Sequence, residues 1–122
     1  MKICITATGE DLDSEIDPRF GRCQYFIFLD SNTMDFNSIP NEYKTDEHDV
    51  GIEASERLIE EGIEVLITGN VGPNALSILS SSGIEIITGA MGAVGYAFEM
   101  YKNGKLISIC DKKAPYCKGK MN

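Results

Sequence analysis

The residues best suited to chemistry lie in one short segment, residues 17–23, which reads Asp-Pro-Arg-Phe-Gly-Arg-Cys. It places two guanidinium groups, those of Arg19 and Arg22, close in sequence to the thiol of Cys23. The planar fork of arginine suits oxyanions, and a nearby positive charge lowers the pKa of a cysteine, which makes its thiolate available as a metal ligand or nucleophile. The alternative is that both arginines pair with local acids such as Asp17 and that Cys23 is a small buried residue.

Two glycine-rich turns form the second feature. Residues 67–75 read Ile-Thr-Gly-Asn-Val-Gly-Pro-Asn-Ala, and their Ile-Thr-Gly-x-x-Gly frame returns at residues 87–93. Such turns between a strand and a helix place backbone N–H groups and the positive end of a helix dipole at one mouth, which favours an anionic ligand. The first turn is the stronger candidate, because Asn70 and Asn74 add side-chain amides. The alternative is that the glycines only permit tight turns and close packing.

Together these features predict one anion-binding site. Its candidate residues are Arg19, Phe20, Gly21, Arg22, Gly69, Asn70, Gly72, Asn74, Gly89 and Gly92. Because ligands of open α/β sheets lie beyond the carboxyl ends of the strands, we expect all three segments to line one contiguous mouth. Neither turn contains a nucleophile, a histidine or an acid, and no Walker A lysine follows, so strong triphosphate binding is disfavoured. The sequence therefore predicts a binding protein rather than an enzyme.

Soft metal ligands are few and widely spaced. The single histidine, His48, lies among acidic residues before a predicted helix, where a solvated loop side chain is the alternative. Cys110 and Cys117 are too far apart for a compact zinc knuckle, but both could contribute thiolates if the chain folds back. The candidate metal ligands are therefore Cys23, His48, Cys110 and Cys117.

Length and composition predict one domain and exclude several partner classes. The chain has 122 residues, 43% of them hydrophobic, and a net charge of −8. We expect a domain over residues 1–110 and a basic tail over residues 111–122, which either solubilises the chain or forms a flap that neutralises an anionic ligand. The acidic balance argues against nucleic acid as a partner. With no signal peptide and no apolar run near the ~20 residues of a membrane span, we expect a cytoplasmic protein with reduced thiols and no membrane partner.

Hydrophobic periodicity predicts the elements that position these residues. Strands are expected at residues 2–7, 25–29, 34–39, 65–67 and 84–87, and a last edge strand at residues 105–109. Helices are expected to begin near Val50, Pro73 and Val94 and to end at Gly62, Gly83 and Gly104. This order predicts a mixed sheet with helices on its faces. The fourth and fifth strands should be parallel neighbours of the first strand or of each other, and residues 25–29 should be antiparallel to their hairpin partner.

Three segments taken together resemble the dinitrogenase iron-molybdenum cofactor biosynthesis family, which includes nitrogenase cofactor carriers and many stand-alone small bacterial and archaeal proteins. They are residues 17–26, residues 48–52 (His-Asp-Val-Gly-Ile) and residues 68–75 (Thr-Gly-Asn-Val-Gly-Pro-Asn-Ala). The resemblance extends from Lys2 to about Leu106. It implies a ribonuclease H-like, three-layer α/β/α fold around a five-stranded mixed sheet. It also implies binding of an iron-sulfur cluster or iron-molybdenum cofactor precursor, with a cluster donor or acceptor protein as partner.

One departure of this chain from the pattern of that family matters for its function. The pattern of the nitrogenase-associated members is similar here but reads His-Phe-Gly where this chain has Arg19-Phe20-Gly21. The resemblance implies that this histidine is the cofactor ligand in those members. Its absence favours another cluster over the nitrogenase cofactor itself, with Cys23 as the nearest soft ligand. We therefore expect a binding or carrier protein for an anionic iron-sulfur species. A metal-free sensor of small anions or nucleotides, and a protein interaction module, are the alternatives.

Overall fold

The computed structural model of the chain describes residues 1–42 and 50–106. Its elements in chain order are β1 (Lys2–Ala7), β2 (Tyr25–Asp30), β3 (Phe36–Pro40), α1 (Val50–Glu60), β4 (Val65–Ile67), α2 (Pro73–Ser81), β5 (Glu85–Ile87) and α3 (Val94–Lys102). The strands form one sheet in the order β3-β2-β1-β4-β5. β1 pairs with β2 antiparallel and with β4 parallel, β2 pairs with β3 antiparallel, and β4 pairs with β5 parallel. The predicted mixed α/β sheet and its strand directions are confirmed.

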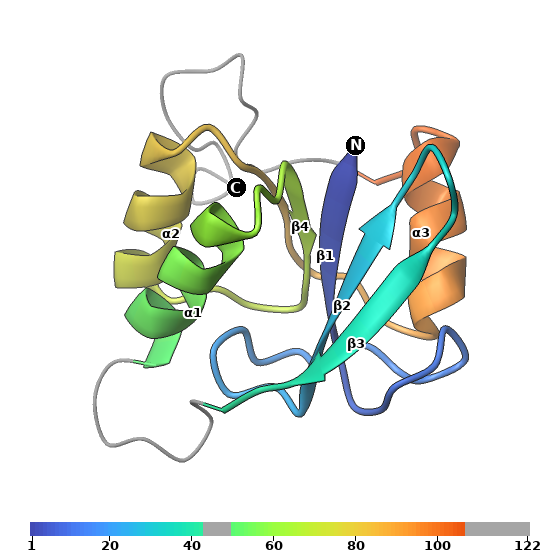
Figure 1. The fold of residues 1–122 in the computed structure, drawn as a ribbon, viewed down its shortest axis with the longest axis horizontal. Coiled ribbons are helices and arrows are strands. Elements are labelled where there is room, and N and C mark those ends of the chain that lie inside the picture. Colours follow the sequence, from blue (N-terminus) through green and yellow to red (C-terminus); the bar gives the residue numbers. More distant parts are fainter. Residues whose placement is uncertain (43–49, 107–122) are drawn as a thin grey trace.

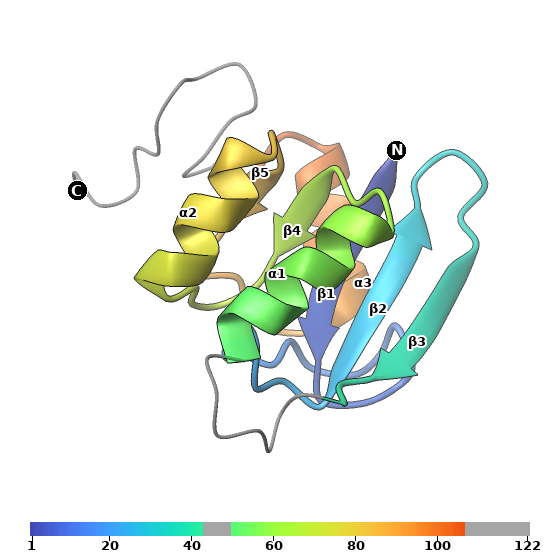
Figure 2. The same ribbon diagram turned by 60° about the vertical axis from the view of Figure 1, so that its left-hand side comes forward.

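Helices cover both faces of the sheet, with α1 and α2 on one face and α3 on the other (Figures 1 and 2). Side chains alternate along a strand, so Cys4 of β1 and Leu66 of β4 belong to the core under α1 and α2. Ile3 and Val65 belong to the core under α3. Because both faces of β1 and β4 are buried, their sequences are almost continuously apolar. The ribonuclease H-like assignment of this three-layer arrangement stays a prediction.

The helices end as the glycines predict, and the hairpin differs from expectation by a short shift. Gly62, Gly83 and Gly104 follow α1, α2 and α3 with positive φ angles of 74°, 78° and 71°. In the hairpin, Met34 has a φ of 67° and donates its N–H to the carbonyl of Asp30 at 2.8 Å. This tight turn occupies residues 31–35, so β3 begins at Phe36 rather than at the predicted residue 34.

Two predictions fall at the end of the described chain. Lys105 and Leu106 are in no strand, so the start of the predicted edge strand at residues 105–109 is wrong, and its other residues lie outside the described ones. The predicted basic tail, residues 111–122, also lies outside them. Within residues 1–42 and 50–106, no helix is long and apolar enough to cross a membrane.

Candidate functional site

The loop after β1 meets the first glycine-rich turn at the carboxyl ends of β1 and β4. Arg19 and Asn70 form an isolated parallel bridge, in which Asn70 donates its N–H to the carbonyl of Pro18 at 2.7 Å and accepts one from Phe20 at 3.2 Å. Gly69 permits this contact, because a Cβ at that position would lie 2.5 Å from the Cα of Pro18. The prediction that the Arg19 loop and the first turn share one mouth is therefore confirmed.

An open pocket of about 410 Å³ lies where these loops meet the first residues of α1 and α2. Among its described lining residues the charged ones are Arg19 and Arg22. The uncharged ones are Phe20, Val50, Gly51, Gly72, Pro73, Asn74 and Ala75. No carboxylate is among these lining residues, although the chain carries a net charge of −8. Of the residues predicted for the anion site, Gly21, Gly69 and Asn70 do not line this pocket, and those that do are Arg19, Phe20, Arg22, Gly72 and Asn74.

The N-terminus of α2 adds to the positive character of this pocket. Gly72 is its N-cap and Pro73 its first helical residue, as the sequence predicts, and no side chain of the described residues caps it. The first N–H groups of a helix have no partner within the helix and carry the positive end of its dipole. The pocket therefore joins a helix N-terminus to two guanidinium groups, which is the combination that suits an anion.

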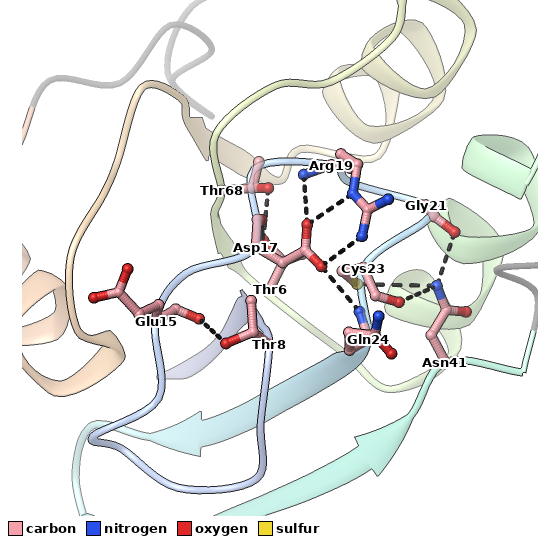
Figure 3. A network of polar contacts seen from close by, with 10 residues as sticks. All are labelled: Thr6, Thr8, Glu15, Asp17, Arg19, Gly21, Cys23, Gln24, Asn41 and Thr68. Atoms are coloured by element: carbon pink, nitrogen blue, oxygen red, sulfur yellow. Dashed lines mark hydrogen bonds and ion pairs between the residues drawn. The ribbon is translucent and has the colours of Figure 1, made fainter.

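Arg19 is held by a buried carboxylate (Figure 3). The Arg19 Nε and Nη2 groups donate to Oδ1 and Oδ2 of Asp17, each at 3.1 Å. The backbone N–H of Arg19 also donates to Oδ1. The Asp17 side chain is 3% exposed and that of Arg19 is 58% exposed. Burial alone would raise the pKa of Asp17, but the hydrogen bonds and charge of Arg19 outweigh it and hold that pKa below its ordinary value. Arg19 thus pairs with a local acid, the alternative left open by the sequence.

Cys23 is buried, which corrects the expectation of an available thiolate. Its side chain is fully buried in the core under α1 and α2. Asn41 encloses it, donating its side-chain amide to the carbonyls of Gly21 and Cys23 at 2.8 and 3.0 Å. Burial, followed by the negative charge of Asp17, raises the pKa of Cys23 to about 12. The charge of Arg19 acts in the opposite direction, but its effect on this pKa is smaller than those of burial and Asp17. The role of Cys23 as a metal ligand stays a prediction.

Phe20 and Gly21 anchor the arginine loop. Phe20 is 8% exposed and packs against Phe26 with ring centroids 6.2 Å apart, so it belongs to the core and also lines the pocket. Gly21 has a φ of 97°, and a Cβ there would lie 3.1 Å from the backbone of Gly51 in α1. Both residues therefore fix where Arg19 and Arg22 stand.

The second glycine-rich turn lies beside the first but does not line the same pocket. Gly89 donates its N–H to the carbonyl of Gly69 at 2.8 Å, so the turns are neighbours. Residues of the second turn instead line a smaller hollow of about 170 Å³ with Met91 and Tyr96. The prediction of one mouth formed by all three segments is wrong in this part. Gly89 and Gly92 are not residues of the arginine pocket.

An earlier part of the same β1–β2 loop covers the N-terminus of α3. Val94 and Gly95, the first residues of that helix, donate their N–H groups to the carbonyls of Ser14 and Leu12, both at 2.8 Å. Gly92 accepts an N–H from Ile16 at 2.9 Å. Backbone carbonyls thus take the donors that an anion would need, which is the physical reason for the correction.

Sequence reasoning missed the polar contacts behind the pocket. Thr6 and Thr68, both fully buried at the ends of β1 and β4, have hydroxyl oxygens 2.7 Å apart, and the Thr6 hydroxyl donates to the carbonyl of Asp17 at 2.7 Å. A threonine ending an apolar strand is a signal that could have indicated them. Asn41 follows Pro40 in a polar stretch that carries no such signal.

The remaining predicted metal ligands lie outside the described residues. These are His48, Cys110 and Cys117. In residues 1–42 and 50–106, no group of three or more His, Cys, Asp and Glu side chains is arranged to hold a metal ion. Val50, two positions after His48, lines the pocket. The three ligands stay predictions.

Comparison with known proteins identifies a family and solved structures that this chain is similar to. The family described as dinitrogenase iron-molybdenum cofactor matches residues 1–104, which include every described pocket residue. The apo form of the orange protein from Desulfovibrio gigas is similar with a TM-score of 0.84 and 35% identity, over 88% of this chain and 91% of that one. A putative NifB protein from Thermotoga is similar with a TM-score of 0.78 and 30% identity, over 89% and 93% of the two chains. An uncharacterized protein of Methanocaldococcus jannaschii is 24% identical over 97 residues, covering 77% and 82%.

Proposed function

Because the chain belongs to the dinitrogenase iron-molybdenum cofactor family, we propose that its arginine pocket binds an anionic iron-sulfur cluster, or a precursor of an iron-molybdenum cofactor, as cargo. One observation carries the proposal. The charged residues of the described pocket lining are two arginines, and they stand at the N-terminus of α2 in a chain with a net charge of −8. The similarity to a protein described as an apo form agrees with a ligand-carrying role.

Hydrogen-bond donors rather than protein ligands hold the cargo in this proposal. The guanidinium groups of Arg19 and Arg22 and the backbone N–H groups at the start of α2 face sulfide or oxide atoms of an anion. Cys23 keeps its proton at neutral pH because its pKa is raised to about 12, so ligation would require both deprotonation and exposure of its sulfur. We therefore assign the main share of binding to the arginines.

The proposed role is binding and transfer, without catalysis. The described lining of the pocket contains no serine, threonine, cysteine, histidine or acidic side chain that could act as nucleophile or general base. A bound cluster would be received from, or passed to, a donor or acceptor protein. The proposal includes a cytoplasmic location, where the free thiols of Cys4 and Cys23 stay reduced.

Anaerobic reconstitution with iron and sulfide tests the cargo. The wild-type protein should gain visible charge-transfer absorption and keep iron through a desalting column. The double variant Arg19→Gln/Arg22→Gln should lose most of both signals, while Cys23→Ser keeps them. Arg57→Gln is the matched control, because Arg57 pairs with Glu61 at 3.0 Å and does not line the pocket.

Two outcomes would contradict the proposal in different ways. Signals lost in Cys23→Ser but kept in the double arginine variant would replace donor binding by thiolate ligation. No absorption in the wild type, together with thermal stabilisation by phosphate or a nucleotide, would favour a metal-free anion sensor. That second function uses the same guanidinium and N–H donors, which accept any small anion of suitable size.

A further inference from the structure

A buried negative charge lies directly behind the arginine pocket. The Asp17 carboxylate is 3% exposed and accepts four hydrogen bonds, three from Arg19 and one from the backbone N–H of Gln24 at 3.2 Å. Asp17 does not itself line the pocket. An anion in the pocket can therefore contact Arg19 directly, and it is also repelled by the Asp17 carboxylate behind that guanidinium.

The backbone of Asp17 is fixed from both sides. Its N–H donates to the carbonyl of Thr6 at 3.0 Å, and its carbonyl accepts the Thr6 hydroxyl at 2.7 Å. Thr6 in turn bonds Thr68 at the end of β4 (Figure 3). The two strands that carry the site thus hold this carboxylate against the Arg19 guanidinium, and the pair acts on the pocket as a unit.

The negative charge of Asp17, in contact with Arg19, weakens the electrostatic attraction of the pocket for an anion. The Asp17 carboxylate places one negative formal charge in contact with Arg19, so the pocket offers an anion one positive unit less than it would without that carboxylate. The interaction of a site with an anion grows with the product of the two charges, so a smaller site charge matters more for a more highly charged anion.

We infer that Asp17 sets the net charge of the pocket and so limits its preference for multiply charged over singly charged anions. This inference rests on the proposed anion-binding role of the pocket. A carrier must also give up its cargo, and a site with the Asp17 carboxylate behind Arg19 releases a multiply charged cluster more readily than the same site without that carboxylate. Asp17 is thus a specificity-determining residue that acts through Arg19.

The test compares two tetrahedral anions of different charge, perchlorate and sulfate. Their affinities for the wild-type protein and for Asp17→Asn are measured by amide NMR titration at pH 7 and constant ionic strength, following Asn74 and Ala75. Asp17→Asn keeps the shape of the side chain and removes its charge. Perchlorate affinity should rise by roughly threefold to tenfold, and sulfate affinity by about the square of that factor, because the anion charge doubles. The hydration of each anion is the same in both proteins and cancels.

Equal factors for the two anions, or a loss of affinity for both, would overturn the inference, since a purely structural role of Asp17 does not depend on anion charge. Asp13→Asn is the matched control, because Asp13 is exposed and is not among the described residues that line the pocket. It should change both affinities far less than Asp17→Asn does, and an equal effect would contradict the role of Asp17.

The outcomes also separate this inference from the proposed function. A wild-type protein that binds neither anion would refute both. Binding of both anions with no cluster after reconstitution would refute only the cargo. Binding of both, with charge-independent effects of Asp17→Asn, would refute only the role of Asp17.

Discussion

The two glycine-rich turns share a sequence frame but have different surroundings. After Gly72, the N-terminus of α2 opens on the arginine pocket, and no side chain of the described residues caps it. After Gly92, the first N–H groups of α3 are taken by the carbonyls of Ser14 and Leu12. The repeat therefore produces the same strand, turn and helix twice, but only one of the helix N-termini faces a pocket lined by arginines.

The two turns also bury different positions of their shared frame, and the buried position is shifted by one residue. In the first turn Asn70 is exposed and Val71 packs against the core, whereas in the second Ala90 is buried and Met91 is 78% exposed. Their glycines differ in purpose. Gly69 admits the backbone of Pro18, while Gly89 has a φ of 76° and open space around its missing Cβ. The comparison teaches that a repeated frame predicts local structure, while the part of the β1–β2 loop that reaches each turn decides its chemistry.

The largest expected effect is at the paired glycines. Gly69→Ala should lower the free energy of unfolding by about 3 kcal/mol, because its Cβ would overlap the Cα and Cβ of Pro18 at 2.5 Å and backbone cannot easily move away. Gly89→Ala should cost only about 1–2 kcal/mol, the penalty of a left-handed conformation without a clash. Urea unfolding of both variants measures the difference. Equal losses would mean that the close contact between the Arg19 loop and the first turn is not what requires Gly69.

The next effect concerns two acids of the β1–β2 loop, Asp17 beside the first turn and Asp13 near the second. Asp17→Ala should cost about 2 kcal/mol at pH 7, since it leaves charge-assisted donors of Arg19 and Gln24 unpaired. Because Arg19 lowers the folded-state pKa of Asp17, this stabilisation is present above the unfolded pKa of about 3.9 and is lost as the pH falls through the lower folded value. Urea unfolding from pH 7 to pH 2.5 should show wild type and variant converging in acid. The exposed Asp13 is the control, and Asp13→Ala should change stability by less than about 0.5 kcal/mol. A difference for Asp17→Ala that is independent of pH would reject the charge argument.

Much of the fold followed from local patterns in the sequence. Continuous apolar runs identified β4 and most of β5, and Pro73 with Gly83 marked the ends of α2 within a residue or two. The carboxyl-end rule then brought the Arg19 loop to the first turn. These are short-range signals or general rules of topology, and they need no knowledge of side-chain contacts.

The electrostatics of the site could not be predicted in the same way. Closeness in sequence predicts that the charge of Arg19 acts on the Cys23 thiol. In the structure the Arg19 guanidinium instead bonds Asp17, and the thiol is buried beside Asn41. Which of several nearby acids an arginine selects depends on burial and loop path, which periodicity does not report. The same holds for residues 12–16, whose approach to α3 no local pattern indicates.

A smaller difference is expected at the threonines that begin the two turns. The Thr6 hydroxyl donates to Asp17, so the Thr68 hydroxyl donates to Thr6, inside a fully buried pair. Thr68→Val should therefore cost about 1.5 kcal/mol, because a buried hydrogen bond is lost with little change in shape. Thr88, the equivalent residue of the second turn, is only half-buried, and Thr88→Val should stay within about 0.5 kcal/mol. Thermal unfolding of the two variants under identical conditions compares their losses of stability. A similar loss in both would contradict the special role of the buried Thr68 hydroxyl.

The smallest effect is expected at Val71 and Met91, which occupy the same position of the shared frame but differ in burial. Val71 is partly buried against the core under α1 and α2, so Val71→Ala should cost about 1 kcal/mol through lost apolar burial. Met91 occupies the same place in the second frame but is 78% exposed, and Met91→Ala should leave stability unchanged within about 0.3 kcal/mol. Urea unfolding resolves this contrast if both variants are compared with the wild type in one series. A loss at Met91 equal to that at Val71 would show that the second turn packs as the first does, and the one-residue offset between the turns would then be wrong.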